Sequence, residues 1–171
     1  MIVYLGLGAA ALGLGSLRGQ PNVWHLAGRE PAVLAGIVSG LAAGLTIVFA
    51  SRMALYRFDW ARALHRELRH LLFPLSDVEI VVLAAASSVG EEMFFRGALL
   101  PAVGLLGSSA IFALLHVGPK ARHLPWTASS FVAGLLFGAM FMWTGDLTGP
   151  ILAHFLVNFL NLRHVTAVEL Q

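Results

Sequence analysis

Apolar stretches separated by short polar ones run through the whole of this chain. Six of them have the pattern of membrane segments: residues 2–17, 32–51, 78–95, 97–116, 127–143 and 147–162. A membrane-spanning helix needs roughly 20 mostly apolar residues, a length that most of these stretches approach. Pro101, Gly104 and Gly107 interrupt the fourth stretch. The pattern predicts an all-α, polytopic integral membrane helical bundle with about six membrane segments.

The polar stretch at residues 52–75 has the pattern of an amphipathic helix. On a helix with 3.6 residues per turn its apolar side chains and its arginines fall on opposite faces. These side chains are Trp60, Leu64, Leu68 and Leu71 on one face and Arg62, Arg66 and Arg69 on the other. Such a helix lies in the membrane interface, either as an anchor on an anionic leaflet or as a gate or docking surface over a site. After it, Ser76 and Glu79 form a capping box that predicts the start of the next helix.

Glycines recur every four residues in two of the predicted spans. Gly36, Gly40 and Gly44 form one series, and Gly134 and Gly138 form another. Small residues at this spacing let two helix backbones approach each other closely in lipid. We therefore expect both series at helix–helix contacts and not in a catalytic role.

The composition agrees with a membrane protein and narrows the classes of function. Of the 171 residues, 58% are hydrophobic and 12% are charged, whereas soluble domains carry about 25% charged residues. The length predicts a single domain, residues 1–171, and the absence of cysteine excludes disulfides and thiol catalysis. No basic region precedes the first apolar stretch, so we expect it to be a retained membrane segment and not a signal peptide.

The placement of the basic residues predicts an orientation. Cytoplasmic loops of membrane proteins are enriched in Lys and Arg, which places residues 52–75 on the cytoplasmic side. Alternation of the spans then puts Lys120, Arg122 and Arg163 on that side and Asp146 on the other. Six spans with both termini inside satisfy this distribution.

Three charged residues lie close together at the end of the third apolar stretch. Ionisable groups inside a bilayer are costly, so each is a functional hypothesis. Glu91 and Glu92 point about 100° apart on a helix, whereas Arg96 follows Glu92 by four residues, the spacing of an ion pair. We expect Glu92 and Arg96 to be a supporting pair and Glu91 to face the interior as a general base. The alternative is a structural charge cluster.

Histidines and asparagines add polar groups to the last membrane stretches. His154, Asn158 and Asn161 lie near one stripe of a helix and must find partners inside the protein; for Asn161 we expect interhelical hydrogen bonding only. Glu91, His116 and His154 could form a three-ligand zinc site with an open position for water. A metal-free scheme is equally open, in which Glu91, assisted by His116, activates water. His154 and Asn158 then donate hydrogen bonds to the oxyanion.

Three short motifs, in this order, resemble those of a known family. Residues 91–96 match E-E-x-x-x-R, residues 112–116 match F-x-x-x-H, and residues 154–158 match H-x-x-x-N. These motifs are typical of the CPBP family (also called the Abi family), the CAAX proteases and bacteriocin-processing enzymes that include the Rce1-type prenyl-protein endopeptidases. The resemblance covers a protease core at about residues 76–162. It leaves residues 1–75, with two spans and the amphipathic helix, outside.

The resemblance implies an all-α membrane fold and peptide-bond hydrolysis near the membrane surface. It implies that Glu91 activates water with His116 as its partner. His154 and Asn158 then form the oxyanion or metal side, and Glu92 and Arg96 support them. The metal-free scheme is favoured, so no cofactor is expected, and zinc on Glu91, His116 and His154 is the alternative.

The resemblance also implies a class of partner and a location. The expected substrate is a membrane-anchored or lipidated protein or peptide, met in the lipid bilayer, and no nucleic-acid partner is expected. The expected location is the cytoplasmic (inner) membrane of a prokaryote, with several passes; the oligomeric state stays open. Two other functions fit the same residues: a non-catalytic immunity or scaffold protein of the same fold, or a small proton-coupled transporter. The order of the motifs favours the protease.

The depth of the polar residues sets a condition for this site. A helix rises 1.5 Å per residue, so Glu91 lies about 8 Å from a helix end near Arg96. A straight helix through residues 97–116 would carry His116 toward the opposite face of the membrane, away from Glu91. We therefore predict a loop or re-entrant stretch at residues 97–107 and a helix that begins near Ser108.

Overall fold

The computed structural model is a bundle of helices and describes residues 1–72, 74–118 and 120–169. Residues 73, 119, 170 and 171 belong to the predicted single domain but lie outside the described residues. The element order is α1 (Ile2–Leu17), α2 (Val33–Arg57), α3 (Asp59–Leu72), α4 (Asp77–Glu92), η1 (Met93–Leu99), α5 (Leu100–Leu114), η2 (Ala121–His123), α6 (Leu124–Thr144) and α7 (Thr148–Ala167). η1 is a π-helix and η2 a 3-10 turn. Within the described residues the extended structure amounts to an isolated bridge between His25 and Asp146, which confirms the all-α class.

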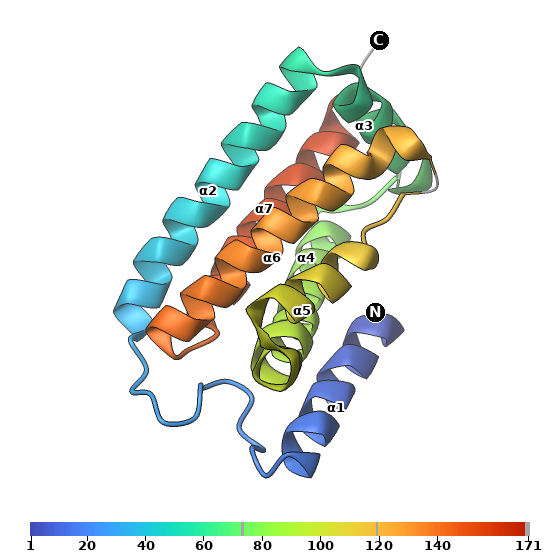
Figure 1. Ribbon diagram of the computed structural model, residues 1–171. Helices are drawn as coiled ribbons and strands as arrows, with labels where there is room; N and C mark the ends of the chain where they lie inside the picture. The colour runs from blue at the N-terminus through green and yellow to red at the C-terminus, as the bar shows by residue number, and fades with distance from the viewer. Residues whose placement is uncertain (73, 119, 170–171) are drawn as a thin grey trace.

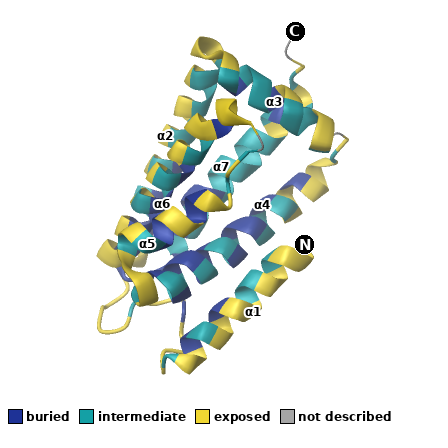
Figure 2. Cartoon of the chain, turned by 45° about the vertical axis from the view of Figure 1, so that its right-hand side comes forward, coloured by how far each residue is buried: buried dark blue, intermediate teal, exposed yellow. Residues whose placement is uncertain are grey.

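The long helices pack side by side and the others cover them. α2, α6 and α7 form one side of the bundle, α4 packs on α7, and α5 packs on α6 (Figure 1). α1 lies on the outside of α4 and η1, with its outer side exposed (Figure 2). α3 lies across the end at which α2 and α7 finish (Figure 1). This arrangement surrounds the end of α4 and the middle of α7 with protein.

Both glycine series lie at close contacts between helices. A Cβ atom added at Gly40 would lie 2.5 Å from the carbonyl oxygen of Gly149, and one at Gly36 would lie 3.3 Å from the nitrogen of Gly149. A Cβ at Gly134 would lie 3.1 Å from the Cβ of Ser109. The prediction for these glycines is confirmed, and their contacts fix α2 against α7 and α6 against α5.

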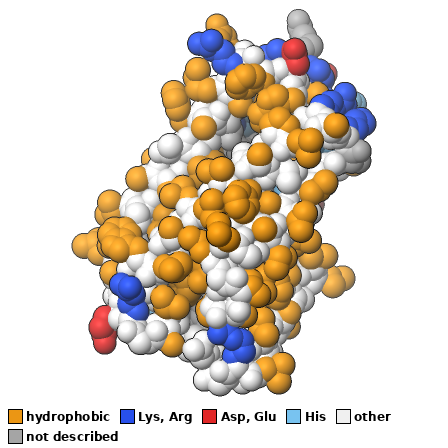
Figure 3. Space-filling model, in the orientation of Figure 1, with side chains coloured by type: hydrophobic (Ala, Val, Ile, Leu, Met, Phe, Trp, Pro, Cys, Tyr) orange, Lys and Arg blue, Asp and Glu red, His pale blue; other side chains and the backbone are white. Residues whose placement is uncertain are grey.

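The surface is that of a membrane bundle, but fewer spans stand out than predicted. Figure 3 shows hydrophobic side chains over the middle of the visible face and Lys and Arg toward its ends. In the part of the chain that the structure describes, three stretches are long and apolar enough to cross a membrane: Val33–Arg57, Asp77–Leu114 and Ala121–Thr144. The prediction of about six segments is therefore too high by this measure. The third and fourth predicted segments form one helical stretch, Ile2–Leu17 is shorter than a span, and polar residues lower the hydropathy of α7.

The helical stretch from α4 to α5 bends back on itself. Its π-helix begins directly after Glu92, and Gly104 interrupts α5 with φ 77° and ψ 172°. Glycine adopts a positive φ readily because it has no Cβ. Residues 97–107 are therefore mostly helical and not the loop that the sequence predicts, since a single glycine makes the bend. The condition that residues 97–116 do not form a straight span is met.

α3 is shorter than the predicted amphipathic stretch because α2 continues to Arg57. Ala61 and His65 face the bundle and are buried, while Leu71 is exposed. The next helix, α4, begins at the predicted capping box. The Ser76 hydroxyl accepts from the Glu79 N–H, and the Glu79 carboxylate accepts from the Ser76 N–H at 2.8 Å.

Candidate active site

A buried polar cluster lies where the end of α4, η1 and the middle of α7 meet. Glu91 and Glu92 end α4, Arg96 lies in η1, and His154 lies in α7. Glu92, Arg96 and His154 are 0%, 1% and 5% exposed. Charged side chains this deeply buried are stable only when they are paired and hydrogen-bonded.

Glu92 is the centre of this cluster. Its Oε1 atom accepts a hydrogen bond from Arg96 Nη1 at 2.9 Å and another from His154 Nδ1 at 2.7 Å. The ion pair predicted from the four-residue spacing is present. The contact with His154 is an addition that sequence spacing does not predict, because the two residues are 62 positions apart.

Aromatic rings enclose the guanidinium of Arg96. Its Cζ atom lies 4.4 Å from the ring centre of Phe112, 5.4 Å from that of Phe137 and 5.9 Å from that of Phe95. Its Nη2 atom donates to the carbonyl oxygen of Gly134 at 3.4 Å. Cation–π attraction is strongest where water is excluded, so this cage holds Arg96 and, through it, the Glu92 carboxylate.

Glu91 lies next to the cluster. Its side chain is 12% exposed, and its Oε2 atom lies 4.0 Å from His154 Nε2. This Oε2 atom is buried and has no hydrogen-bond partner. The two carboxylates diverge as helix geometry predicts, yet both reach His154, because the imidazole presents one nitrogen to each of them.

The asparagines of α7 have separate partners. Asn158 Nδ2 donates to the hydroxyl of Ser87 at 2.9 Å. Ser87 precedes Glu91 by four residues, so it lies on the same face of α4, one turn away. Asn161 accepts from Arg52 Nη1 at 2.7 Å and bonds Ser51 in α2, which confirms its predicted interhelical role.

His116 is joined to the cluster through an aromatic ring. Its Nδ1 atom donates to the carbonyl oxygen of Phe112 at 2.8 Å, and the two rings are 4.5 Å apart. The same Phe112 ring lies 6.0 Å from that of His154. Within the described residues no hydrogen bond links His116 to Glu91 or His154. The structure thus brings Glu91, Glu92, Arg96 and His154 together, and His116 contacts this cluster only through Phe112 among the described residues.

The predicted zinc ligands do not form a binding set in this conformation. Among residues 1–72, 74–118 and 120–169, no group of three or more His, Asp or Glu side chains is arranged to hold a metal ion. Glu91 and His154 are adjacent, but His116 contacts the Phe112 ring and has no ion pair or hydrogen bond to either of them in the described part of the chain.

Several residues of the site escape sequence reasoning. Phe137 and Gly134 of α6 contact Arg96, and Ser87 binds Asn158. Spacing points to Ser87 alone, because it lies one helical turn before Glu91. The ring and the carbonyl of α6 carry no signal, since an apolar residue or a glycine in a span is ordinary.

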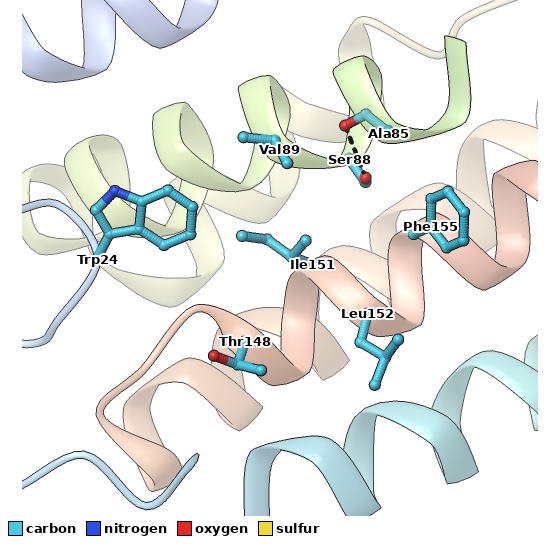
Figure 4. A pocket seen from close by; sticks show the side chains of 8 residues that line it. All are labelled: Trp24, Ala85, Ser88, Val89, Thr148, Ile151, Leu152 and Phe155. Carbon is cyan, nitrogen blue, oxygen red and sulfur yellow. Dashed lines mark hydrogen bonds between the residues drawn. The ribbon is translucent and has the colours of Figure 1, made fainter. Parts of the chain in front are cut away.

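An apolar pocket lies beside the cluster and is distinct from it. It has a volume of about 350 Å³ between α4 and α7, and Trp24 forms its end wall (Figure 4). Its remaining lining residues are Ala85, Ser88, Val89, Thr148, Ile151, Leu152 and Phe155. None of these is a predicted site residue, and Ser88 and Thr148 are the polar side chains among them.

Comparisons with known proteins agree with the motifs. Residues 74–160 match the family described as type II CAAX prenyl endopeptidase Rce1-like. The uncharacterized protein YpbD of Bacillus subtilis (strain 168) is 40% identical over 82 residues, which is 46% of this chain and 41% of that protein. The chain thus spans less than half the length of this relative. No solved structure matches this chain. The resemblance stated from the motifs is confirmed: the chain belongs to the Rce1-like family of type II CAAX prenyl endopeptidases.

Proposed function

We propose that this protein is an intramembrane endopeptidase that cuts a peptide bond of a membrane-associated protein or peptide with water activated by Glu91. One observation carries the proposal. A buried chain of contacts runs from Arg96 through Glu92 to His154 and leaves a carboxylate oxygen of Glu91 without a partner beside His154 Nε2. Glu92 also has a buried oxygen without a partner, Oε2, but its Oε1 is held by Arg96 and His154 and its side chain is 0% exposed. The Glu91 side chain is 12% exposed, so of the two carboxylates it is the one that water can reach, as a general base requires.

In the reaction, Glu91 takes a proton from water as the water oxygen attacks the peptide carbonyl carbon. The resulting tetrahedral species carries its negative charge on the former carbonyl oxygen. Glu91 then passes the proton to the amide nitrogen as the C–N bond breaks, which yields a carboxyl group and a free amine.

His154 and Asn158 serve the oxyanion. Glu92 accepts from His154 Nδ1, which holds the ring with Nε2 toward Glu91. The four charged groups Glu91, Glu92, Arg96 and His154 sum to zero when His154 carries both protons, and Nε2–H is then a donor for the oxyanion. Asn158 uses one N–H on Ser87 and has a second for the same purpose.

His116 assists Glu91 through Nε2, because its Nδ1 is occupied by the Phe112 carbonyl. This nitrogen is the one left to hold the attacking water, which requires the His116 ring to approach Glu91 when substrate binds. No step passes through a metal, although zinc on Glu91, His116 and His154 is kept as the alternative that the assay below separates.

The proposal includes a setting for the reaction. The protein lies in a prokaryotic cytoplasmic membrane with the α3 end on the cytoplasmic side, as its arginines predict. Its substrate is membrane-anchored or lipidated, which agrees with the family name and with a cluster buried among apolar helices.

A cleavage assay in detergent tests the proposal. The substrates are a farnesylated CAAX-type peptide, the same peptide without the lipid, and a single-span peptide, each with and without a chelator. The wild type and an Asp77→Asn control, changed at the exposed start of α4, should cleave at least one of them. Glu91→Gln should cleave none and should keep its melting temperature.

Three other results would contradict parts of the proposal. Equal cleavage by Glu91→Gln would refute the catalytic role of this carboxylate. Loss of cleavage with chelator and recovery with zinc would replace the metal-free scheme. Unchanged biological activity of Glu91→Gln in cells would favour the non-catalytic immunity or scaffold function.

A further inference from the structure

One carboxylate on α3 binds a group of cations from the connection between α5 and α6. Glu67 Oε1 accepts from Lys120 Nζ at 2.9 Å and also from Arg122 Nη2, and Glu67 Oε2 lies 3.1 Å from His123 Nε2. We call these four residues the Glu67 cluster. Glu67 lies outside residues 74–160, the part of the chain that matches the family.

His123 distinguishes this cluster from an ordinary surface ion pair. Its side chain is 1% exposed, and neither ring nitrogen has a hydrogen-bond partner. His123 Nε2 therefore lies beside the Glu67 carboxylate without a hydrogen bond to it. Gly118 packs so closely on the His123 ring that a Cβ there would collide with it. The segment is folded tightly around a buried imidazole whose nearest acidic group is on α3.

The same connection carries His116. The hydroxyl of Thr127, in the first turns of α6, donates to the carbonyl oxygen of His116 at 2.9 Å, and the ring of Trp126 lies edge-on at 5.7 Å. Lys120, Arg122 and His123 fall between His116 and these two residues in the sequence. Movement of this segment would therefore displace His116.

α3 is itself fixed to α7. His65 Nε2 donates to the carbonyl oxygen of Val168 at 2.9 Å, and Arg69 Nη1 donates to those of Val165, at 3.0 Å, and Thr166. These bonds saturate carbonyl groups at the end of α7, which lack partners within the helix. α3 thus joins the end of the helix that carries His154 to the segment that carries His116.

We propose that Glu67 is a positioning residue, which fixes the position of His116 relative to His154. The inference rests on the proposed function, because it assigns a role to Glu67 through His116. α5 meets α7 through the edge-on contact of the Phe112 and His154 rings at 6.0 Å. The ion pairs of Lys120 and Arg122 with Glu67 add a second contact that fixes the segment after α5 relative to α3.

These ion pairs are present over the physiological pH range. Hydrogen bonds from Lys120 and Arg122 lower the pKa of Glu67 to about 2. The carboxylate is therefore ionised at any pH well above that value, so Glu67 can pair with Lys120 and Arg122 throughout the physiological range.

The absence of cysteine from the chain allows a direct test. Spin labels on Leu71→Cys in α3 and Val117→Cys beside His116, both at exposed positions, report the distance between the two elements by electron paramagnetic resonance. The variants are Glu67→Gln, the charge swap Glu67→Lys with Lys120→Glu, and Asp59→Asn. Asp59 is the matched control, because it pairs with Arg62 on its own helix.

The expected result is a narrow distance distribution in the wild type and in Asp59→Asn, a broad one in Glu67→Gln, and a narrower one in the charge swap. In unlabelled protein, kcat on the cleaved peptide should fall on the order of 10- to 100-fold in Glu67→Gln with KM little changed, because a misplacement of about 1 Å costs this much. The charge swap should recover part of kcat.

A narrow distribution in Glu67→Gln would overturn the inference whatever its activity. A broad distribution with unchanged kcat would overturn it as well, since catalysis would then not depend on Glu67. If the wild type cleaves none of the peptides, the proposed function has failed and with it the role of Glu67 in catalysis. The spin-label distances would still decide whether Glu67 holds the connection.

Discussion

The Glu92 carboxylate accepts two hydrogen bonds on one oxygen and none on the other. Oε1 accepts from Arg96 and His154, whereas Oε2 is buried without a hydrogen-bond partner. Desolvation of such a group is costly, and the ion pair offsets it only while both charges are present. Removal of one charged partner should therefore lower the stability of the protein, and paired substitutions can separate this effect from the effect on activity.

Arg96→Met should destabilise the protein by about 3–5 kcal/mol, because it leaves the Glu92 charge buried without its main partner. The double variant Arg96→Met with Glu92→Met should regain most of this stability, since apolar side chains of similar volume replace a buried pair well. Activity should be lost in both. Thermal unfolding in detergent measures the first effect and peptide cleavage the second.

The control is Asp59→Asn, which breaks an exposed pair and should leave both measurements near the wild type. A double variant as unstable as Arg96→Met would contradict this explanation. It would show that the site depends on the hydrogen bond to His154 more than on charge balance.

At the scale of the element, the stretch from α4 to α5 depends on its irregularities. The π-helix widens the helix where Arg96 turns toward α6, and such segments recur at functional sites. Arg18 of the α1 end donates to the carbonyl oxygens of Ala98 and Pro101 at 2.9 Å each. Ser108 donates to that of Phe95 at 2.7 Å. The Phe95 carbonyl also accepts from the Leu100 N–H, so Ser108 adds a second bond there, and Arg18 ties the end of α1 to the distorted stretch.

Gly104→Ala should cost about 1–3 kcal/mol, since φ 77° with ψ 172° is a backbone conformation that almost only glycine adopts. No atom within 4 Å would meet the added methyl group, so the loss is conformational. Gly13→Ala, in the exposed part of α1 and equally free of neighbours, should instead gain about 0.5–1 kcal/mol from helix propensity.

Melting temperatures of the two variants in one detergent give the comparison. Equal effects of the two alanines would show that the bend at Gly104 is not needed for stability. A fall in kcat in Gly104→Ala beyond the change in stability would tie the bend to the placement of His116.

At the scale of the molecule, charge gathers at the α3 end. The Glu67 cluster, the arginines of α3 and the end of α7 lie there. Among the described residues, the opposite end has the contact of His25 with the buried Asp146 at 3.0 Å and the Arg18 hydrogen bonds to Ala98 and Pro101. Most of the ionic contacts between helices thus lie at the α3 end, which is also the end of α7 and the end nearest to His116 along the chain.

Stability of this end should depend on pH only in acid. The pKa of Glu67 is lowered from 4.5 to about 2 in the folded protein. Its contribution is therefore complete above about pH 4.5 and is lost as the pH falls toward 2. The pKa of Glu79 is also lowered, by the Ser76 hydrogen bonds, and acts in the same direction.

Melting temperatures between pH 7 and pH 2 should fall less steeply for Glu67→Gln than for the wild type, and the remaining slope belongs in part to Glu79. Parallel curves for the two proteins would show that the Glu67 cluster is not formed in solution.

Local relations in this protein follow from the sequence alone. The Glu92–Arg96 pair, the capping box at Ser76 and the glycine contacts of α2 were all predictable, because helix geometry sets which residues meet at spacings of three and four. The three motifs also identified the family. The number of spans was overestimated, since a hydropathy pattern does not show that one helical stretch bends back at Gly104.

Only the tertiary structure decided how these local pieces meet. Which oxygen of Glu92 meets His154 and which basic side chains surround Glu67 depend on residues 53 to 62 positions apart. Such distances are set by how helices cross and where a backbone bends, and these depend on many contacts at once. The sequence therefore determined which chemical groups are present and their local pairing. The packing of α4 on α7 determined that His154 meets both Glu91 and Glu92.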